Sequence, residues 1–221
     1  MTVAIVVAMF ALILLADYLV SKAAKPVAVR KPVGQVWNAP RLEPAVVGGL
    51  KVAENLKYHP GHTWALSESP QKVRVGIDDL AGHLFGKIDG IKTPAAGSWV
   101  RQGQPVLTFN REGREAKLVS PIEGVVTAIN PALKEDADLA RRDPYGEGWI
   151  MTIEAPDAKT SFRNLLGGTM ALRWMEDATA KLRAMMPTGS YALAQDGGLM
   201  VDDLTPLIED WDAAKKEFFL D

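Results

Sequence analysis

The middle of the chain alternates between short apolar stretches and turn residues, a pattern typical of β-strands. Residues 72–77 (KVRVGI) alternate strictly, and the apolar stretches 106–109 and 117–119 flank the charged segment 110–113. A charged turn between two apolar strands predicts an exposed β-hairpin, in which Gly113 can take a positive φ. Many short strands, separated by Gly and Pro, predict an all-β sandwich or barrel over this region.

The pattern becomes helical after Pro156. Apolar residues between 169 and 186 recur with i, i+3, i+4, i+7 spacing, which predicts one amphipathic helix with a single apolar stripe. A single stripe favours packing on the β domain over packing on a partner. Trp174, Met185 and Met186 remain candidates for partner binding, because methionine adapts to different surfaces.

A last helix is predicted from Thr205-Pro206 onward, with Trp211 and Phe218 in its apolar stripe. A monomer rarely leaves such a stripe exposed, so Trp211, Phe218 and Phe219 are partner-binding candidates too. We expect Trp211 to pack on the chain's own domain. We expect a partner to bury Phe218 and Phe219, because a chain terminus gains little from folding back alone.

The first segment predicts a membrane anchor. Residues 3–20 are apolar apart from Asp17, and eighteen helical residues rise about 27 Å, enough for a hydrocarbon core. No Lys or Arg precedes the segment, whereas Lys22 and Lys25 follow it, which predicts an N-terminus outside and a C-terminal domain in the cytoplasm. The expected location is therefore the inner membrane, in a single pass. Asp17 lies near the inner end, where it can meet the headgroups or a partner helix.

These patterns divide the chain into four parts. They are an anchor (1–21), a proline-rich linker (22–56), a β domain (57–157) and a helical C-terminal extension (158–221). The linker should be largely extended. It contains Trp37, a further candidate for partner binding.

Composition excludes several kinds of chemistry. The net charge of −2 gives no indication of nucleic-acid binding, and the absence of cysteine excludes disulfides, thiol nucleophiles and thioether haem. His59, His62 and His83 lack the spacing of a metal site. No nucleophile, phosphate-loop or dinucleotide motif is present. The sequence thus predicts no catalytic residues, no bound metal and no cofactor, and hence a protein that is not an enzyme.

Five segments of the middle region resemble one family. They are HTWA (62–65), VGIDDLAGHLFGKI (75–88), TPAAGSWVRQGQPV (93–106), SPIEGVVTAIN (120–130) and DPYGEGWIMTI (143–153). In order and spacing they are similar to the H protein of the glycine cleavage system. The resemblance implies a mainly β fold, a lipoyl-type β-sandwich of the hammerhead type. To this the patterns above add an N-terminal transmembrane helix and C-terminal α-helices.

The resemblance also implies a covalent lipoyl group on a lysine at the hairpin tip, eight residues before the proline of an SP(I/L)xG motif. Counting back from Pro121 reaches Gly113, which has no side chain to acylate. The chain is therefore expected to be a divergent, membrane-anchored relative without the carrier lysine.

The function expected from these features is that of a non-catalytic accessory or scaffold subunit of a membrane complex. Its partners would be integral membrane subunits and the lipid bilayer. One alternative is a lipoyl carrier modified at Lys117, four residues beyond the expected tip. A second is an adaptor that docks a lipoylated partner, and an enzyme with an unrecognised site also remains open.

Overall fold

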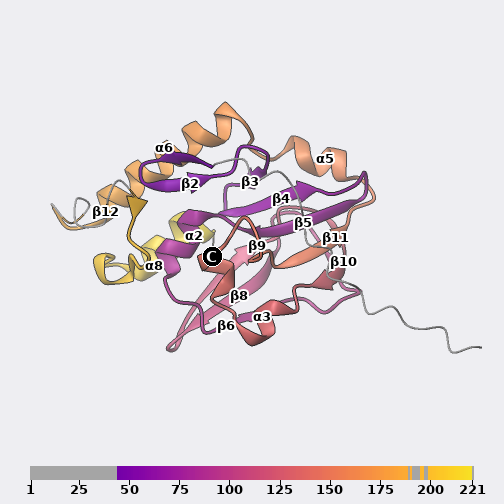
Figure 1. Cartoon of the computed structure of the whole chain (residues 1–221), viewed down its shortest axis with the longest axis horizontal. Helices are drawn as coiled ribbons and strands as arrows, with labels where there is room; N and C mark the ends of the chain where they lie inside the picture. The colour runs from indigo at the N-terminus through magenta and orange to yellow at the C-terminus, as the bar shows by residue number, and fades with distance from the viewer. Residues whose placement is uncertain (1–43, 189, 191–194, 197–198, 221) are drawn as a thin grey trace, which may run out of the picture. The chain divides into compact units, whose positions relative to one another are not determined.

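The alternating middle region forms two antiparallel sheets. The computed structural model describes residues 44–188, 190, 195–196 and 199–220 (Figure 1). The larger sheet has the order β3-β4-β5-β11-β10-β7 and the smaller one the order β6-β8-β9. The larger sheet consists of β3 (Lys57–His59), β4 (Thr63–Ser67), β5 (Lys72–Ile77), β11 (Met151–Glu154), β10 (Gly124–Ile129) and β7 (Trp99–Val100). The smaller sheet consists of β6 (Gly90–Lys92), β8 (Pro105–Arg111) and β9 (Arg114–Val119).

Both sheets contribute to one hydrophobic core. The inward residues of β5 and of the β8–β9 hairpin are almost fully buried in the same cluster, among them Val73, Val75, Leu107, Phe109 and Leu118. The mainly β architecture predicted from the sequence is thus present.

Helices cover the sheets on more than one side. They are α2 (Asp79–Phe85), α3 (Ala132–Glu135), α4 (Leu139–Arg142), α5 (Ala158–Arg163) and α6 (Thr169–Met185). Helix α2 begins after Asp78, whose side chain accepts a hydrogen bond from the backbone N–H of Ala81, and it ends at Gly86 with φ 70°. Helix α6 confirms the helix predicted over 169–186, with Ala171, Met175 and Leu182 buried.

Part of the predicted linker packs on this domain. The strands β1 (Ala45–Val47) and β2 (Leu50–Val52) pair with each other and lie beside α6 (Figure 1). Leu50 and Val52 belong to the common core. The described part of the linker therefore packs on the domain, because its apolar side chains are buried in the core beside α6.

The last predicted helix differs from the expectation. The chain continues through β12 (Gln195–Asp196) and β13 (Leu199–Met200) to a 3₁₀ turn, η1 (Thr205–Leu207). The helix begins only at α8 (Trp211–Ala214) and continues as a π-helical turn, η2 (Lys215–Phe219). The later start has a local cause, because the Asp210 side chain accepts a hydrogen bond from the backbone N–H of Ala213 and so caps a new helix.

The predicted membrane segment, with Asp17, and Trp37 of the linker lie outside the described residues. Among the helices of the described ranges, none is both long enough and apolar enough to cross a membrane.

Candidate functional site

The β8–β9 hairpin ends in a tight two-residue turn. Arg111 pairs with Arg114 as the last rung, so Glu112 and Gly113 alone form the turn, with φ values of 45° and 84°. Two successive positive φ values are characteristic of a type I′ turn, whose twist matches that of the strands. The turn is therefore shorter than the predicted segment 110–113, and both strands extend further toward the tip.

A third strand explains that extension. β6 pairs with β8 up to Asn110, and the Asp89 carboxylate accepts a hydrogen bond from the backbone N–H of Glu112 (3.2 Å). The hairpin is thus held from its β6 side almost to the turn. Sequence patterns give little sign of β6, because it has only three residues.

The position of the family's lysine lies in open space. A methyl group added at Gly113 would meet no atom within 4 Å. Lys117, the alternative attachment site, lies within β9 opposite Thr108 and is exposed. A side chain at residue 113 would therefore project from the tip, whereas that of Lys117 projects from the face of a paired strand.

The C-terminal extension reaches the hairpin through Arg111. Its Nη1 atom lies 2.7 Å from Asp203 Oδ2, donates a hydrogen bond to Thr205 Oγ1 (3.0 Å) and a longer one to the carbonyl of Phe85 (3.3 Å). Asp203 also accepts a hydrogen bond from the backbone N–H of Thr205 (2.9 Å). One guanidinium therefore joins the hairpin, the end of α2 and the segment before η1.

This junction depends on a close backbone approach at Gly86. A Cβ atom there would lie 2.2 Å from Arg111 Nη1 and 2.3 Å from Asp203 Oδ1. Burial acts to raise the pKa of Asp203, but the hydrogen bonds from Thr205 and Arg111 outweigh it, and the pKa is lowered. The carboxylate is therefore held in its charged form beside the guanidinium.

Aromatic rings next to this junction also join the C-terminal extension to α2 and to the hairpin. The Trp211 ring packs against Phe85 (centroids 5.8 Å apart) and Phe219 (6.3 Å), and the Arg114 guanidinium lies 6.0 Å from its centroid. Phe219 is fully buried, and η2 contacts β9. The C-terminal extension thus covers one flank of the hairpin with apolar surface.

A second cluster connects the extension to the start of the β domain. The His62 ring stacks on Trp174 (4.6 Å, 28°), lies 5.7 Å from the Phe218 ring, and its Nδ1 is 2.7 Å from the Asp78 carboxylate. His62 and Asp78 are both buried. Because Asp78 also caps α2, this pair has a structural role in joining β4, α2, α6 and η2.

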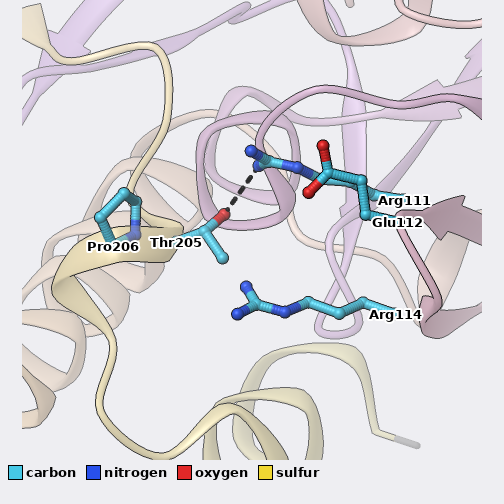
Figure 2. A pocket seen from close by; sticks show the side chains of 5 residues that line it. All are labelled: Arg111, Glu112, Arg114, Thr205 and Pro206. Atoms are coloured by element: carbon cyan, nitrogen blue, oxygen red, sulfur yellow. Dashed lines mark hydrogen bonds between the residues drawn. The ribbon is translucent and has the colours of Figure 1, made fainter.

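A hollow of about 310 Å³ remains between the turn and the extension. Its lining consists of Arg111, Glu112, Arg114, Thr205 and Pro206, and Figure 2 shows Arg111 pointing toward the Thr205 hydroxyl with Arg114 beside it. The lining contains two guanidinium groups and one carboxylate, that of Glu112. Among the described residues no group of three or more metal-ligating side chains comes together.

The structure places most of the partner-binding candidates against this chain. Phe218 and Phe219 are 1% and 0% exposed, so the expectation that a partner buries them is wrong: their own domain does. The physical reason is that η2 packs on β9, with the His62 ring beside Phe218 and the Trp211 ring beside Phe219. Met186 is buried as well, whereas Trp174, Met185 and Trp211 are partly exposed. Partner binding by any of these candidates stays a prediction.

Sequence reasoning missed the junction around Arg111. In the sequence, Arg111 is one of the charged residues of the predicted turn 110–113. Its partners Asp203 and Thr205 lie over 90 positions later. Asp203 and Thr205 do have the spacing of a side chain that bonds the backbone two residues on. Nothing in that local pattern indicates a distant arginine.

The two sheets with an outward-pointing hairpin define the class of the protein as an H-protein-like lipoyl fold. A family model described as glycine cleavage H-protein matches residues 56–178, more than half of the chain, and the chain belongs to this family. The H protein from Coprothermobacter proteolyticus is 36% identical over 108 residues, which cover 49% of this chain and 85% of the relative. The one from Xanthomonas euvesicatoria is 32% identical over 127 residues, covering 58% and 96%.

A solved structure supports the same fold. The crystal structure of the H protein from Mycobacterium marinum superposes with a TM-score of 0.50 at 22% identity and covers 57% of this chain and 98% of its own. The matched residues end at 178, so the segment that covers the hairpin, residues 199–220, lies outside the family model.

These findings correct the expected location. The prediction of a single-pass inner-membrane protein with a cytoplasmic domain is contradicted, because the relatives are glycine cleavage system H proteins. The family carries lipoate and is not itself catalytic. The predicted partners, integral membrane subunits and the bilayer, remain untested.

Proposed function

We propose that this chain is an H protein without a lipoyl group, which serves as a non-catalytic binding or scaffold subunit of a protein complex. The observation that supports this most directly is Gly113 at the tip of the hairpin, eight residues before Pro121. Glycine offers no atom for acylation, so the attachment chemistry of the family has no acceptor at its usual place.

The conformation of the turn supports the same conclusion. Gly113 has φ 84°, in the left-handed region that side chains rarely adopt. A lysine at this position would be strained by roughly 1 kcal/mol. The turn as built is suited to closing the hairpin tightly rather than to displaying a long side chain.

The C-terminal extension supports a role that does not need a mobile carrier. It fixes Arg111, two residues from Gly113, in an ion pair with Asp203 and a hydrogen bond to Thr205, and it covers the flank of β9. A carrier hairpin needs access for the enzymes that use it, whereas a scaffold needs a defined surface.

The alternative of a carrier modified at Lys117 rests on one observation, the exposure of that side chain on β9. Lys117 lies on the fourth pair of residues from the turn, opposite Thr108. A modifying enzyme would have to approach a paired strand at this point instead of a free tip.

A replacement assay tests the proposal. The full chain is added in place of the H protein in a reconstituted glycine cleavage system, after incubation with a lipoate ligase. We expect glycine cleavage at the level measured without any H protein. The matched control is an authentic H protein with its carrier lysine changed to glycine, and its unchanged form supplies the positive signal. Restored cleavage by the full chain would overturn the proposal.

A further inference from the structure

A second hollow, of about 350 Å³, lies at the base of the β8–β9 hairpin. Its lining comes from β7, the segments next to β8 and β10, and α5, and it consists of Trp99, Gln102, Glu123, Pro156, Asp157, Thr160, Ser161 and Asn164. β8 has seven residues, so this hollow lies about 20 Å along the strand from the turn. It is therefore separate from the hollow beside the tip.

Trp99 contributes an exposed aromatic side chain to the lining of this hollow. Half of its surface is accessible, although its backbone is fixed by pairing with Val125 at the edge of the larger sheet. Among the described residues no aromatic ring or cation stacks on it. An exposed tryptophan held on a strand presents a π-face at low entropic cost.

Hydrogen bonds hold the polar side chains that line the hollow in place. Gln102 donates hydrogen bonds from Nε2 to the carbonyls of Pro121 (2.8 Å) and Ser161 (2.9 Å). Its Oε1 accepts one from Asn164 Nδ2 (2.8 Å). These bonds join the segment before β8 to α5, so the shape of the hollow is present before any ligand arrives.

The charge of the lining has one sign. Glu123 and Asp157 contribute carboxylates, and no lysine or arginine lines the hollow. Asp157 accepts a hydrogen bond from the backbone N–H of Thr160 (3.2 Å), and this bond lowers the pKa of its carboxyl group. Both carboxylates are exposed, which keeps them accessible to a ligand.

We propose that this hollow binds a lysine or arginine side chain of a partner protein, with Trp99 against the cation and Glu123 and Asp157 as its charge partners. Tryptophan is the best aromatic partner for a cation, and a guanidinium can stack on its ring while it donates to carboxylates. The inference deepens the proposed scaffold function, because it names the chemistry of the partner surface.

The test measures binding to the full chain by NMR of its tryptophan indole N–H groups, with Trp99 assigned from the spectrum of Trp99→Phe. The probe is N-acetyl-arginine amide, which has the side-chain cation without charged termini. The neutral comparison probe is N-acetyl-citrulline amide, which has almost the same shape. We expect the Trp99 signal to shift saturably with the arginine probe and to stay in place with the citrulline probe.

Two variants locate the charge partners. Glu123→Gln and Asp157→Asn should each raise the Kd about threefold, the size expected for an exposed charge pair. Asparagine also caps helices, so Asp157→Asn keeps the start of α5 intact. Glu135→Gln, an exposed carboxylate on α3 outside the hollow, is the matched control and should leave the Kd unchanged.

Several outcomes would overturn the inference. They are an equal response to citrulline, no saturable response of Trp99, or equal effects of Glu135→Gln and Glu123→Gln. Saturable binding of free arginine but not of the amide would assign the hollow to a small zwitterion instead of a protein side chain. None of these results depends on lipoylation, so a failure here is distinguishable from a failure of the proposed function.

Discussion

The two ends of the β8–β9 hairpin differ in what covers them. At the tip, Arg111 is tied to Asp203 and Thr205, and the Arg114 guanidinium lies 6.0 Å from the centre of the Trp211 ring. At the base, Trp99 stays half exposed beside two carboxylates. The end where the family has its carrier lysine is thus the end that residues 203–211 of this chain contact. The comparison teaches that the partner surface proposed above lies at the end of the hairpin opposite to the tip.

The largest expected effect comes from removing a buried apolar side chain of the C-terminal segment. Phe219→Ala should lower the free energy of unfolding by about 3–5 kcal/mol, because it leaves a cavity among Trp211 and the neighbouring core. Urea unfolding of the full chain measures the loss. Leu220→Ala, at a residue that is 49% exposed, is the control and should cost far less. Equal small losses in both variants would show that the extension does not pack as described.

The next effect concerns the junction. Arg111→Met should cost about 1–3 kcal/mol, because it leaves Asp203 without its cation and the Thr205 hydroxyl without its donor. Arg114→Met removes only a contact 6.0 Å from the Trp211 ring and should cost less than about 1 kcal/mol. Both are measured by urea unfolding. A larger cost for Arg114→Met would reverse the assigned roles of the two arginines.

The features that could be predicted from the sequence are those fixed by residues close together in the chain. The strand 72–77 and the helices starting after Asp78 and over 169–186 were predictable, because caps and periodicity are local signals. The family motifs also indicated that Gly113 occupies the position of the family's carrier lysine. The junction of Arg111 with Asp203 was not predictable, since it depends on tertiary contact over a long sequence separation. The prediction that a partner buries Phe218 was wrong for the same reason, because its contact with His62 joins distant parts of the sequence.

A smaller effect is expected at the turn itself. Gly113→Ala should cost about 1 kcal/mol, because a Cβ atom disfavours φ 84° even though no neighbour lies close. Gly113→Asn should cost less, since asparagine tolerates this region. Thermal unfolding of both variants is the measurement. No loss in Gly113→Ala would mean that the turn relaxes to another type without strain.

The smallest expected effect is on pH dependence. Burial acts to lower the pKa of His83, but the Asp79 carboxylate and the Val201 carbonyl outweigh it, so the pKa is raised. Protonated His83 therefore stabilises the folded chain. This stabilisation is fully present below about pH 6.5, the pKa of an unperturbed histidine, and is lost as the pH rises through the higher pKa of His83 in the folded chain. The Tm of the chain should therefore fall less between pH 6 and pH 8 in His83→Gln. The same change in Tm with pH in both proteins would show that His83 does not cause the pH dependence of stability.

The central claim, an H protein without a lipoyl group, is tested most directly by the intact mass of the full chain. The chain is produced together with a lipoate ligase that fully modifies an authentic H protein in the same cells, and Lys117→Arg is prepared alongside. We predict the mass of the unmodified polypeptide for both forms, apart from processing of its initiator methionine. A mass increase of one lipoyl group in the natural chain, lost in Lys117→Arg, would contradict the claim and make this protein a carrier.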